Sequence, residues 1–298
     1  MSASDPVLSM AKNKSKAGTD WWGELKSIFW LLLAVLAFHS FVAKPFYIPS
    51  ESMMPVLLKG DRLVVSKYPY GWSWVSPSFH ILPPMEGRLF GRVPERGDVV
   101  IVTPPGQSSD YIKRVIGLPG DELEMVEGQL FINGQPVRRQ VQPATLIPVD
   151  ANVPCAADDF GDARQTGADG KLYCRLPVVR ETLPNGRSFD TIDRGYNPVV
   201  DDFAKLKVPA NHVFLMGDNR DQSADSRVPI QNFGLGGPVP IENIGGRAEF
   251  ITFSLDGTSE YVNPISWFSA LRGGRAGSSL HPQEGTPAPA RIEGAQAK

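Results

Sequence analysis

Cysteine and histidine, the residues that most often hold metals or build disulfide frameworks, are scarce in this sequence. Its two cysteines, Cys155 and Cys174, form no Cys-x-x-Cys pair. Its four histidines stand far apart and fit no metal-ligand spacing such as His-Glu-x-x-His: His39, His80, His212 and His281. A zinc site is therefore not predicted. We expect no metal and no cofactor, with the histidines as surface or packing residues.

An excess of charge of either sign is also absent. The 30 lysines and arginines nearly balance the 32 acidic residues, for a formal net charge of −2. Basic residues are spread along the chain, so nucleic acid is not an expected partner. The 298 residues, 42% of them hydrophobic, suffice for a sizeable core, and length alone suggests two domains.

The first half of the chain has one long hydrophobic run, near its start. Residues 1–20 are polar and are read as a tail on the cytoplasmic side. Ile28 to Ala43 carries no acid, lysine or arginine; extended back to Leu25 it reaches about 28 Å as a helix, close to the hydrocarbon thickness of a membrane. We predict a transmembrane signal-anchor helix over 21–43. A cleavable signal peptide is the rival interpretation, less favoured because the run is long and Phe41 is too large for a cleavage-site residue.

The lysines around this segment predict its orientation. Four precede the span and only Lys44 follows it closely: Lys12, Lys14, Lys16 and Lys26. The positive-inside tendency then leaves the N-terminus in the cytoplasm and everything from Lys44 onward outside, with membrane lipid as a partner.

Beyond Lys44 the pattern changes to short strands and turns. β-branched runs predict strands at 61–66 and 98–103, and alternation with an Asn-Gly turn predicts a hairpin over 123–137. Residues 138–208 are polar and turn-rich, which is typical of an insertion that decorates a β core. Residues 273–298 are rich in Gly, Ala, Pro and Ser and are predicted to be disordered. Between the first two strands, an aromatic loop either covers the core or places Trp72 and Trp74 in the lipid interface.

Three further stretches carry the candidate chemistry. The first is Ile48-Pro-Ser-Glu-Ser-Met-Met-Pro55, in which two serines stand on backbone stiffened by prolines. The second, Asp110-Tyr-Ile-Lys-Arg-Val-Ile-Gly-Leu-Pro-Gly-Asp121, reads as a strand with a lysine among apolar residues. The third is the polar loop Gly217-Asp-Asn-Arg-Asp-Gln-Ser-Ala-Asp-Ser-Arg227. In order, residue identity and spacing, the three stretches closely resemble those of type I signal peptidases, the membrane-bound serine proteases with a Ser-Lys dyad. The similarity covers roughly residues 44 to 255.

The resemblance implies roles for these residues. Ser52 would be the nucleophile, Lys113 the general base and Ser223 the hydroxyl that orients the lysine amine. The Ser52 N–H and the Ser50 hydroxyl would form the oxyanion hole, and Asp225 and Arg227 would support the site. Shallow apolar walls that admit alanine-sized side chains of exported preproteins would come from six residues: Ile48, Pro49, Met53, Leu57, Tyr111 and Ile112.

The chemistry itself constrains Lys113. A lysine can take a proton from a serine only when it is neutral, so Lys113 must be desolvated and its pKa lowered by several units. On a strand, Tyr111 and Lys113 share a face, whereas Arg114 points to the other, where it could pair with Asp218. Glu51 stands where many family members have glycine; because a carboxylate near the oxyanion would oppose its charge, we expect Glu51 to face solvent.

Two other readings of these motifs fail. A penicillin-binding type of enzyme needs Ser-x-x-Lys, but Pro55 stands three residues after Ser52. The acids of residues 218–225 do not fall at EF-hand positions. The remaining alternative is a membrane-tethered peptide-binding or scaffold protein that kept the fold without activity.

The resemblance also implies an overall plan. The fold would be mainly β, an antiparallel catalytic domain over 44–272 with an inserted smaller β region at about 122–208, preceded by the single transmembrane helix. The protein would sit in the bacterial inner membrane with its catalytic domain on the periplasmic side. In that oxidising compartment Cys155 and Cys174 are expected to form a disulfide.

Overall fold

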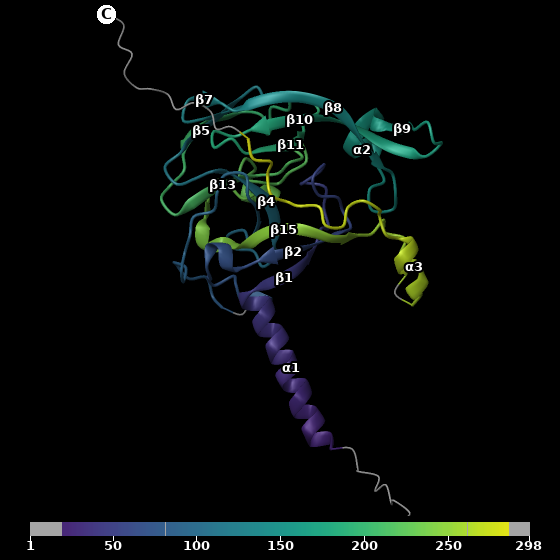
Figure 1. Cartoon of the computed structure of the whole chain (residues 1–298). Coiled ribbons are helices and arrows are strands. Elements are labelled where there is room, and N and C mark those ends of the chain that lie inside the picture. The colour runs from purple at the N-terminus through teal and green to yellow at the C-terminus, as the bar shows by residue number, and fades with distance from the viewer. Residues whose placement is uncertain (1–19, 81, 261, 286–298) are drawn as a thin grey trace, which may run out of the picture. The chain divides into compact units, whose positions relative to one another are not determined.

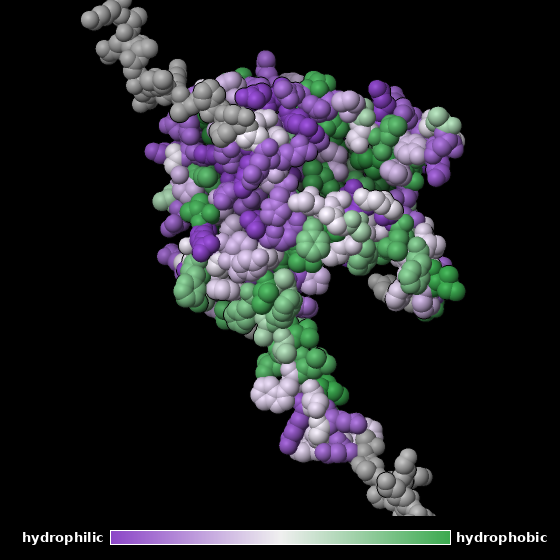
Figure 2. All heavy atoms as spheres, viewed as in Figure 1, coloured by the Kyte–Doolittle hydropathy of each residue, from purple (hydrophilic) through white to green (hydrophobic). Residues whose placement is uncertain are grey.

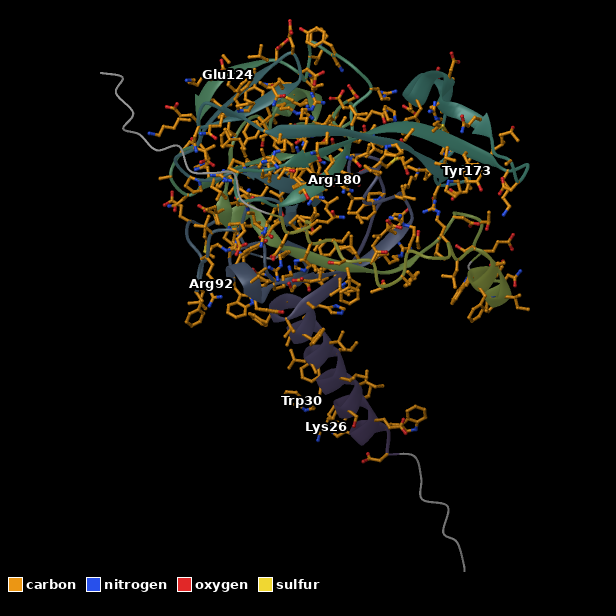
Figure 3. The ribbon with its side chains drawn as sticks, turned by 45° about the horizontal axis from the view of Figure 1, so that its top comes forward. Lys26, Trp30, Arg92, Glu124, Tyr173 and Arg180 are labelled. Carbon is orange, nitrogen blue, oxygen red and sulfur yellow. A yellow bond between two sulfur atoms is a disulfide. The ribbon has the colours of Figure 1, made fainter. Side chains whose placement is uncertain are left out.

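The computed structural model describes residues 20–80, 82–260 and 262–285. The chain divides into two units, residues 1–37 and 38–298. Most of the helix α1, Trp21–Phe41, belongs to the first unit. This helix of 21 residues is long and apolar enough to cross a membrane, as the sequence predicts. Its visible surface beyond the first turns is predominantly apolar (Figure 2), and Lys26 and Trp30 project from its N-terminal half (Figure 3).

The second unit is built on an antiparallel sheet of seven strands (Figure 1). The strand order is β1-β2-β15-β3-β4-β13-β14. The last strand in the sequence, β15, therefore lies between β2 and β3. The bounds, in that order, are Ala43–Tyr47, Asp61–Ser66, Ile244–Ser254, Val99–Val102, Tyr111–Gly117, His212–Met216 and Val239–Pro240. The predicted mainly-β class is therefore confirmed.

Alternating side chains bury both faces of this sheet. One face places Leu63, Ile101 and Ile112 in a core with the segment that follows β1. The other face packs Val100, Val115 and Leu215 against the loops that carry Tyr70 and Leu235. Because both faces are covered, the strands read as β-branched runs, which is why the sequence predicts several of them closely.

Two smaller sheets form the inserted region. One has the order β12-β5-β6-β7, with bounds Phe203–Lys207, Glu122–Val126, Gln129–Ile132 and Gln135–Pro136. The other is β11-β10-β8, with bounds Ser188–Ile192, Leu172–Thr182 and Arg138–Pro148, and β9, Arg164–Thr166, pairs with β10. Tyr173 lies toward the outer end of β10 and Arg180 over the body of the protein (Figure 3). The predicted single hairpin over 123–137 is a meander with two turns, at Glu127–Gly128 and at Asn133–Gly134.

Short helices complete the part of this unit that the structure describes. Two are α-helical, α2 at Ala157–Phe160 and α3 at Pro264–Ser269. Five are 3₁₀ turns: Tyr68–Tyr70, Ser78–His80, Gly161–Ala163, Ile230–Asn232 and Ile241–Asn243. Trp74 is buried, as expected of a loop that covers the core; Trp72 is half-buried, and its indole N–H donates to the Phe41 carbonyl at 2.9 Å.

The insertion does more than decorate the core. The Cys155–Cys174 disulfide is present, and both cysteines pack in one cluster with Met54 and Leu58, which follow Ser52 closely in the chain. The insertion is thus a packing partner of the candidate site, which the polar composition of residues 138–208 does not indicate.

The C-terminal segment corrects another expectation. Residues 273–285, predicted to be disordered, pack along the large sheet, and Leu280 is buried in its core. Arg275 forms a salt bridge with the buried carboxylate of Asp61, at 2.5 Å. The prediction failed because it rests on a composition dominated by Gly and Ser. The packing depends instead on a few side chains, such as Arg275 and Leu280, whose partners are distant in the sequence. The rest of the predicted tail, 286–298, lies outside the described residues.

Candidate active site

The segment after β1 presents Ser52 to the strand β4. Ser52 lies in a turn held by hydrogen bonds from Met54 N–H to Glu51 O and from Leu57 N–H to Met53 O. Its own carbonyl accepts the N–H of Asn219 at 3.0 Å. The turn is thereby fixed to the loop of residues 217–227, so the first and third sequence motifs meet here.

Lys113 completes the pair from the middle of β4. Its Nζ lies 2.9 Å from the Ser52 Oγ, and the two residues are 3% and 7% exposed. Burial lowers the pKa of Lys113 to about 8; the charges of Asp225 and Asp218 act against that shift. As expected for a shared strand face, the amine lies over the Tyr111 ring, 5.6 Å from its centroid.

The loop of residues 217–227 forms the floor of the site. Gly217 N–H donates to Asp225 at 2.9 Å, and Arg227 forms a buried salt bridge with the same carboxylate. A Cβ on Gly217 would lie 2.1 Å from the Ser223 Oγ and 2.5 Å from the Ser52 carbonyl oxygen, so only glycine allows this close approach.

The predicted pairing of Arg114 with Asp218 is present, on the opposite face of β4 from Lys113. Arg114 donates to both carboxylate oxygens of Asp218, at 2.7 and 2.6 Å, and to the Gly97 carbonyl. Both partners are buried. This bidentate pair clamps the loop of residues 217–227 to the strand that carries Lys113.

The insertion supports the same loop from its other side. Arg220 donates to both carboxylate oxygens of Glu181 on β10 at 2.7 Å, and this pair is buried. The backbone of Ile192 pairs with the loop through bonds to Asp218 O and from Arg220 N–H. Sequence reasoning missed these contacts because neither partner stands in a recognisable spacing.

A cleft of about 550 Å³ opens over Ser52 and Lys113. Four of the six predicted wall residues line it: Ile48, Pro49, Tyr111 and Ile112. Met53 and Leu57 are not among the lining residues described; both are wholly buried in the core, and their place in the wall stays a prediction. The lining also includes residues that the prediction missed: Phe46, Tyr47, Ile101, Ser109, Asp110, Asp159, Gln222 and Ala224.

Three polar residues differ in how they stand beside the pair. The exposed Ser50 places its Oγ 3.4 Å from that of Ser52. Ser223 is buried, and its Oγ makes no hydrogen bond to another described residue, so the predicted bond to the Lys113 amine is absent. Glu51 is half-buried in the cleft wall and does not simply face solvent as predicted.

Metal and histidine chemistry find no support in the cleft. Within residues 20–80, 82–260 and 262–285, no three His, Cys, Asp or Glu side chains are grouped to hold a metal ion. No histidine is among the described residues that line the cleft. Lys113 is the one basic side chain described there.

Comparison with known proteins identifies the class. A family model described as signal peptidase, peptidase S26, matches residues 21–253. Signal peptidase I of Rickettsia typhi is 34% identical over 258 residues, which cover 82% of this chain and 85% of the relative. Signal peptidase I of Rickettsia bellii is 32% identical over 250 residues, 81% of this chain and 75% of the relative. A crystal structure of a signal peptidase I from Enterococcus faecalis aligns with 52% of this chain and 97% of its own, at 21% identity and a TM-score of 0.26.

The chain is a serine peptidase. More particularly, it belongs to the signal peptidase family, peptidase S26.

Proposed function

We propose that this protein is a membrane-bound endopeptidase that removes signal peptides from exported preproteins, with Ser52 as nucleophile and Lys113 as general base. The observation that carries the proposal is the 2.9 Å contact between the Lys113 amine and the Ser52 hydroxyl in a buried site. A serine needs a base within hydrogen-bond reach, and a lysine qualifies once burial lowers its pKa toward neutrality.

The reaction follows from this geometry. The neutral amine of Lys113 takes the Ser52 hydroxyl proton as the Oγ attacks the carbonyl carbon of the cleaved bond. The lysine then gives that proton to the leaving amine, and the signal peptide remains bound to Ser52 as an ester. Water, deprotonated by the same amine, hydrolyses the ester and restores both side chains.

Charge on the carbonyl oxygen develops beside two donors. The Ser52 N–H and the Ser50 hydroxyl would stabilise the oxyanion; Ser50 already stands at the cleft, 3.4 Å from the nucleophile. Ser223 would orient the amine. Its hydroxyl is buried beside Gly217 and makes no hydrogen bond to another described residue, which leaves it available for this role. Asp225 and Arg227 hold the loop that carries Ser223.

The substrate would bind as an added strand on β4. Tyr111, Ile112 and Lys113 pair with β3 on one side, whereas β13 covers the other edge only from Arg114 onward. The backbone of residues 111–113 is therefore open, among the described strands, where the cleft lies. The walls of Ile48, Tyr111 and Ile112 would accept small side chains before the cleaved bond.

The anchor and its surroundings form part of the same proposal. We infer a cytoplasmic tail over 1–20, a single membrane-spanning helix over 21–43 and a catalytic domain from residue 44 on the periplasmic side of the bacterial inner membrane, with lipid and preproteins as partners. The apolar helix α1 and the lysines before it support this arrangement. Protease added to spheroplasts would then digest the domain beyond Lys44; its protection until lysis would reverse the orientation.

Cleavage of a preprotein tests the activity directly. Detergent-solubilised full-length protein should release the signal peptide from a preprotein, and Ser52→Ala should abolish that release. Ser259→Ala is the matched control, because Ser259 lies outside the cleft. A Ser52→Ala variant as active as the control would refute the nucleophile, and binding without cleavage by the wild type would favour a scaffold.

A further inference from the structure

Two carboxylates that come from outside β4 line the cleft. Glu51 immediately precedes the nucleophile, and Asp159 comes from α2 in the insertion. They are 108 positions apart in the sequence, yet the charge of Asp159 acts on Glu51. The cleft thus has one wall from β1 and β4 that is largely apolar and another that is acidic.

Hydrogen bonds to backbone and amide groups fix the acidic wall. The Asn219 side-chain NH₂ donates to Glu51 O at 3.2 Å and to the Gln222 Oε1 at 3.0 Å. Gln222 in turn donates to Asp159 O at 2.7 Å. Glu51 and Asp159 are therefore held through their main chains by the same loop that carries Ser223, and their positions do not depend on their carboxylates.

The carboxylates themselves are left for a ligand. Neither makes a hydrogen bond or ion pair with another described residue. Burial and then the charge of Asp159 raise the pKa of Glu51, against a smaller opposing effect of Lys59. The other carboxylate and the one amine among the described lining side chains belong to Asp110 and Lys113. A positive charge placed between Glu51 and Asp159 would relieve their repulsion.

The open edge of β4 indicates which part of the substrate reaches this wall. Residues before the cleaved bond would occupy the edge at Tyr111 to Lys113, and from Arg114 onward β13 blocks it. The chain after the bond must therefore leave β4 at Ser52. The lining beside Ser52 includes Glu51, which a chain of hydrogen bonds through Asn219 and Gln222 joins to Asp159.

We propose that Glu51 and Asp159 select preproteins that carry a lysine or arginine among the first three residues after the cleaved bond. This inference rests on the proposed function, since it names the substrate class of that same cleft. It makes Glu51 and Asp159 specificity-determining residues that touch the substrate but take no part in proton transfer.

The test uses the full-length protein and peptides identical except for lysine, alanine or glutamate at the first, second or third position after the bond. We expect kcat/KM to be about fivefold higher for lysine than for glutamate at one of these positions, the size of two partly exposed ion pairs. The preference should shrink in high salt. It should approach one in the double variant Glu51→Gln, Asp159→Asn, with each single variant between.

Asp158→Asn is the matched control, because Asp158 is an exposed acid on α2 that does not line the cleft. It should keep the full lysine preference. Equal cleavage of lysine and glutamate peptides at all three positions would overturn the inference while leaving the peptidase activity established. A preference that persists unchanged in the double variant would overturn it too.

A binding measurement separates this inference from the proposed function. Ser52→Ala keeps both carboxylates and should bind the lysine peptide more tightly than the glutamate peptide; the triple variant Ser52→Ala, Glu51→Gln, Asp159→Asn should not discriminate. If the wild type cleaves no peptide, the proposed function fails, and this comparison still decides whether the acidic wall recognises a cation. Equal binding of both peptides to Ser52→Ala would refute the recognition.

Discussion

The amine of Lys113 lies 2.9 Å from the hydroxyl oxygen of Ser52, although the two residues are 61 positions apart in the sequence. The contact exists because the turn after β1 is bonded to the loop after β13, and that loop is clamped to β4 by Arg114 and Asp218. The three sequence motifs are therefore one structure, and losing any of their links should displace the pair.

The first prediction concerns the base. Lys113→Ala should lower cleavage by orders of magnitude, because no other described basic side chain lines the cleft. Replacing His39, His80, His212 and His281 together should leave most of the activity, since none of them is among the lining residues described. Single-turnover cleavage measures both. Full activity in Lys113→Ala would show that another group takes the serine proton.

The sequence predicts several strands and the Ser52–Lys113 pair, but not the residues that the insertion brings to the site. The strand at Asp61–Ser66 and those around residues 99 and 111 follow from β-branched runs in a sheet buried on both faces. Ser52 and Lys113 follow from motif order. Asp159 and Glu181 do not, because their place depends on how the insertion folds back, which no local periodicity encodes. Nor does the sequence distinguish Met53 from the residues that line the cleft, because an apolar residue beside a nucleophile can point into the core or into the cleft with the same sequence pattern.

A second prediction concerns the disulfide. Cys155 and Cys174 are 19 positions apart, and closing such a loop is worth ~3 kcal/mol in the chain-entropy model. The double variant to serine should lose about that much stability. Because the pair packs against Met54 and Leu58, the loss should reach the Ser52 turn and not the insertion alone. Alkylation and mass measurement of denatured, unreduced protein should find no free thiol; two free thiols would refute the bridge.

A third prediction concerns the buried Glu181–Arg220 pair. Glu181→Gln leaves Arg220 buried without its counter-charge, so we expect a loss of about 3–5 kcal/mol in the free energy of unfolding. The turnover rate should fall as well, even where the variant is fully folded, because Arg220 belongs to the loop that carries Ser223. Urea unfolding and cleavage assays at low temperature measure the two effects.

The control for this variant is an ion pair made by the residue next to Glu181 on β10. Arg180 pairs with Asp190 between β10 and β11, but both side chains are about one-third exposed. Asp190→Asn should therefore cost less than about 1 kcal/mol and leave turnover unchanged. If Glu181→Gln behaved like Asp190→Asn, the insertion would have no part in positioning the site.

A fourth prediction concerns the C-terminal segment that packs on the sheet. Truncation after Arg272 removes the salt bridge of Arg275 to the buried Asp61 and the core residue Leu280, so it should strongly destabilise the protein. Leu280→Ala alone should cost about 2–5 kcal/mol. Truncation after Gly285 removes no contact seen among the described residues and serves as the control. Equal melting temperatures for the two truncations would contradict this account.

The last prediction concerns the protonation of Lys113. Burial lowers its pKa from 10.5 to about 8, so cleavage should decline as the pH falls below about 8, where the amine holds its proton and cannot take that of Ser52. The effect on stability is opposite to that of a lysine in a salt bridge, whose contribution is lost as the pH rises. Between about pH 8 and 10.5 the unfolded chain binds more protons than the folded one, so this group makes the free energy of unfolding rise with pH over that window.

Below about pH 8 the folded protein bears the full free-energy cost of burying the protonated Lys113 amine. A shift of this size, at about 1.4 kcal/mol per pKa unit, amounts to ~3 kcal/mol. Lys113→Met is similar in bulk and has no charge, so it should be inactive yet more stable than wild type at pH 7 by up to that amount. The advantage should vanish as the pH approaches 10.5.

Lys205→Met, at an exposed lysine paired loosely with Glu122, should change stability by less than about 0.5 kcal/mol at either pH. Urea unfolding at pH 7 and pH 10 makes the comparison. A Lys113→Met variant clearly less stable than wild type at pH 7 would mean that protein partners fully stabilise the protonated amine, and the general-base role would lose its physical basis.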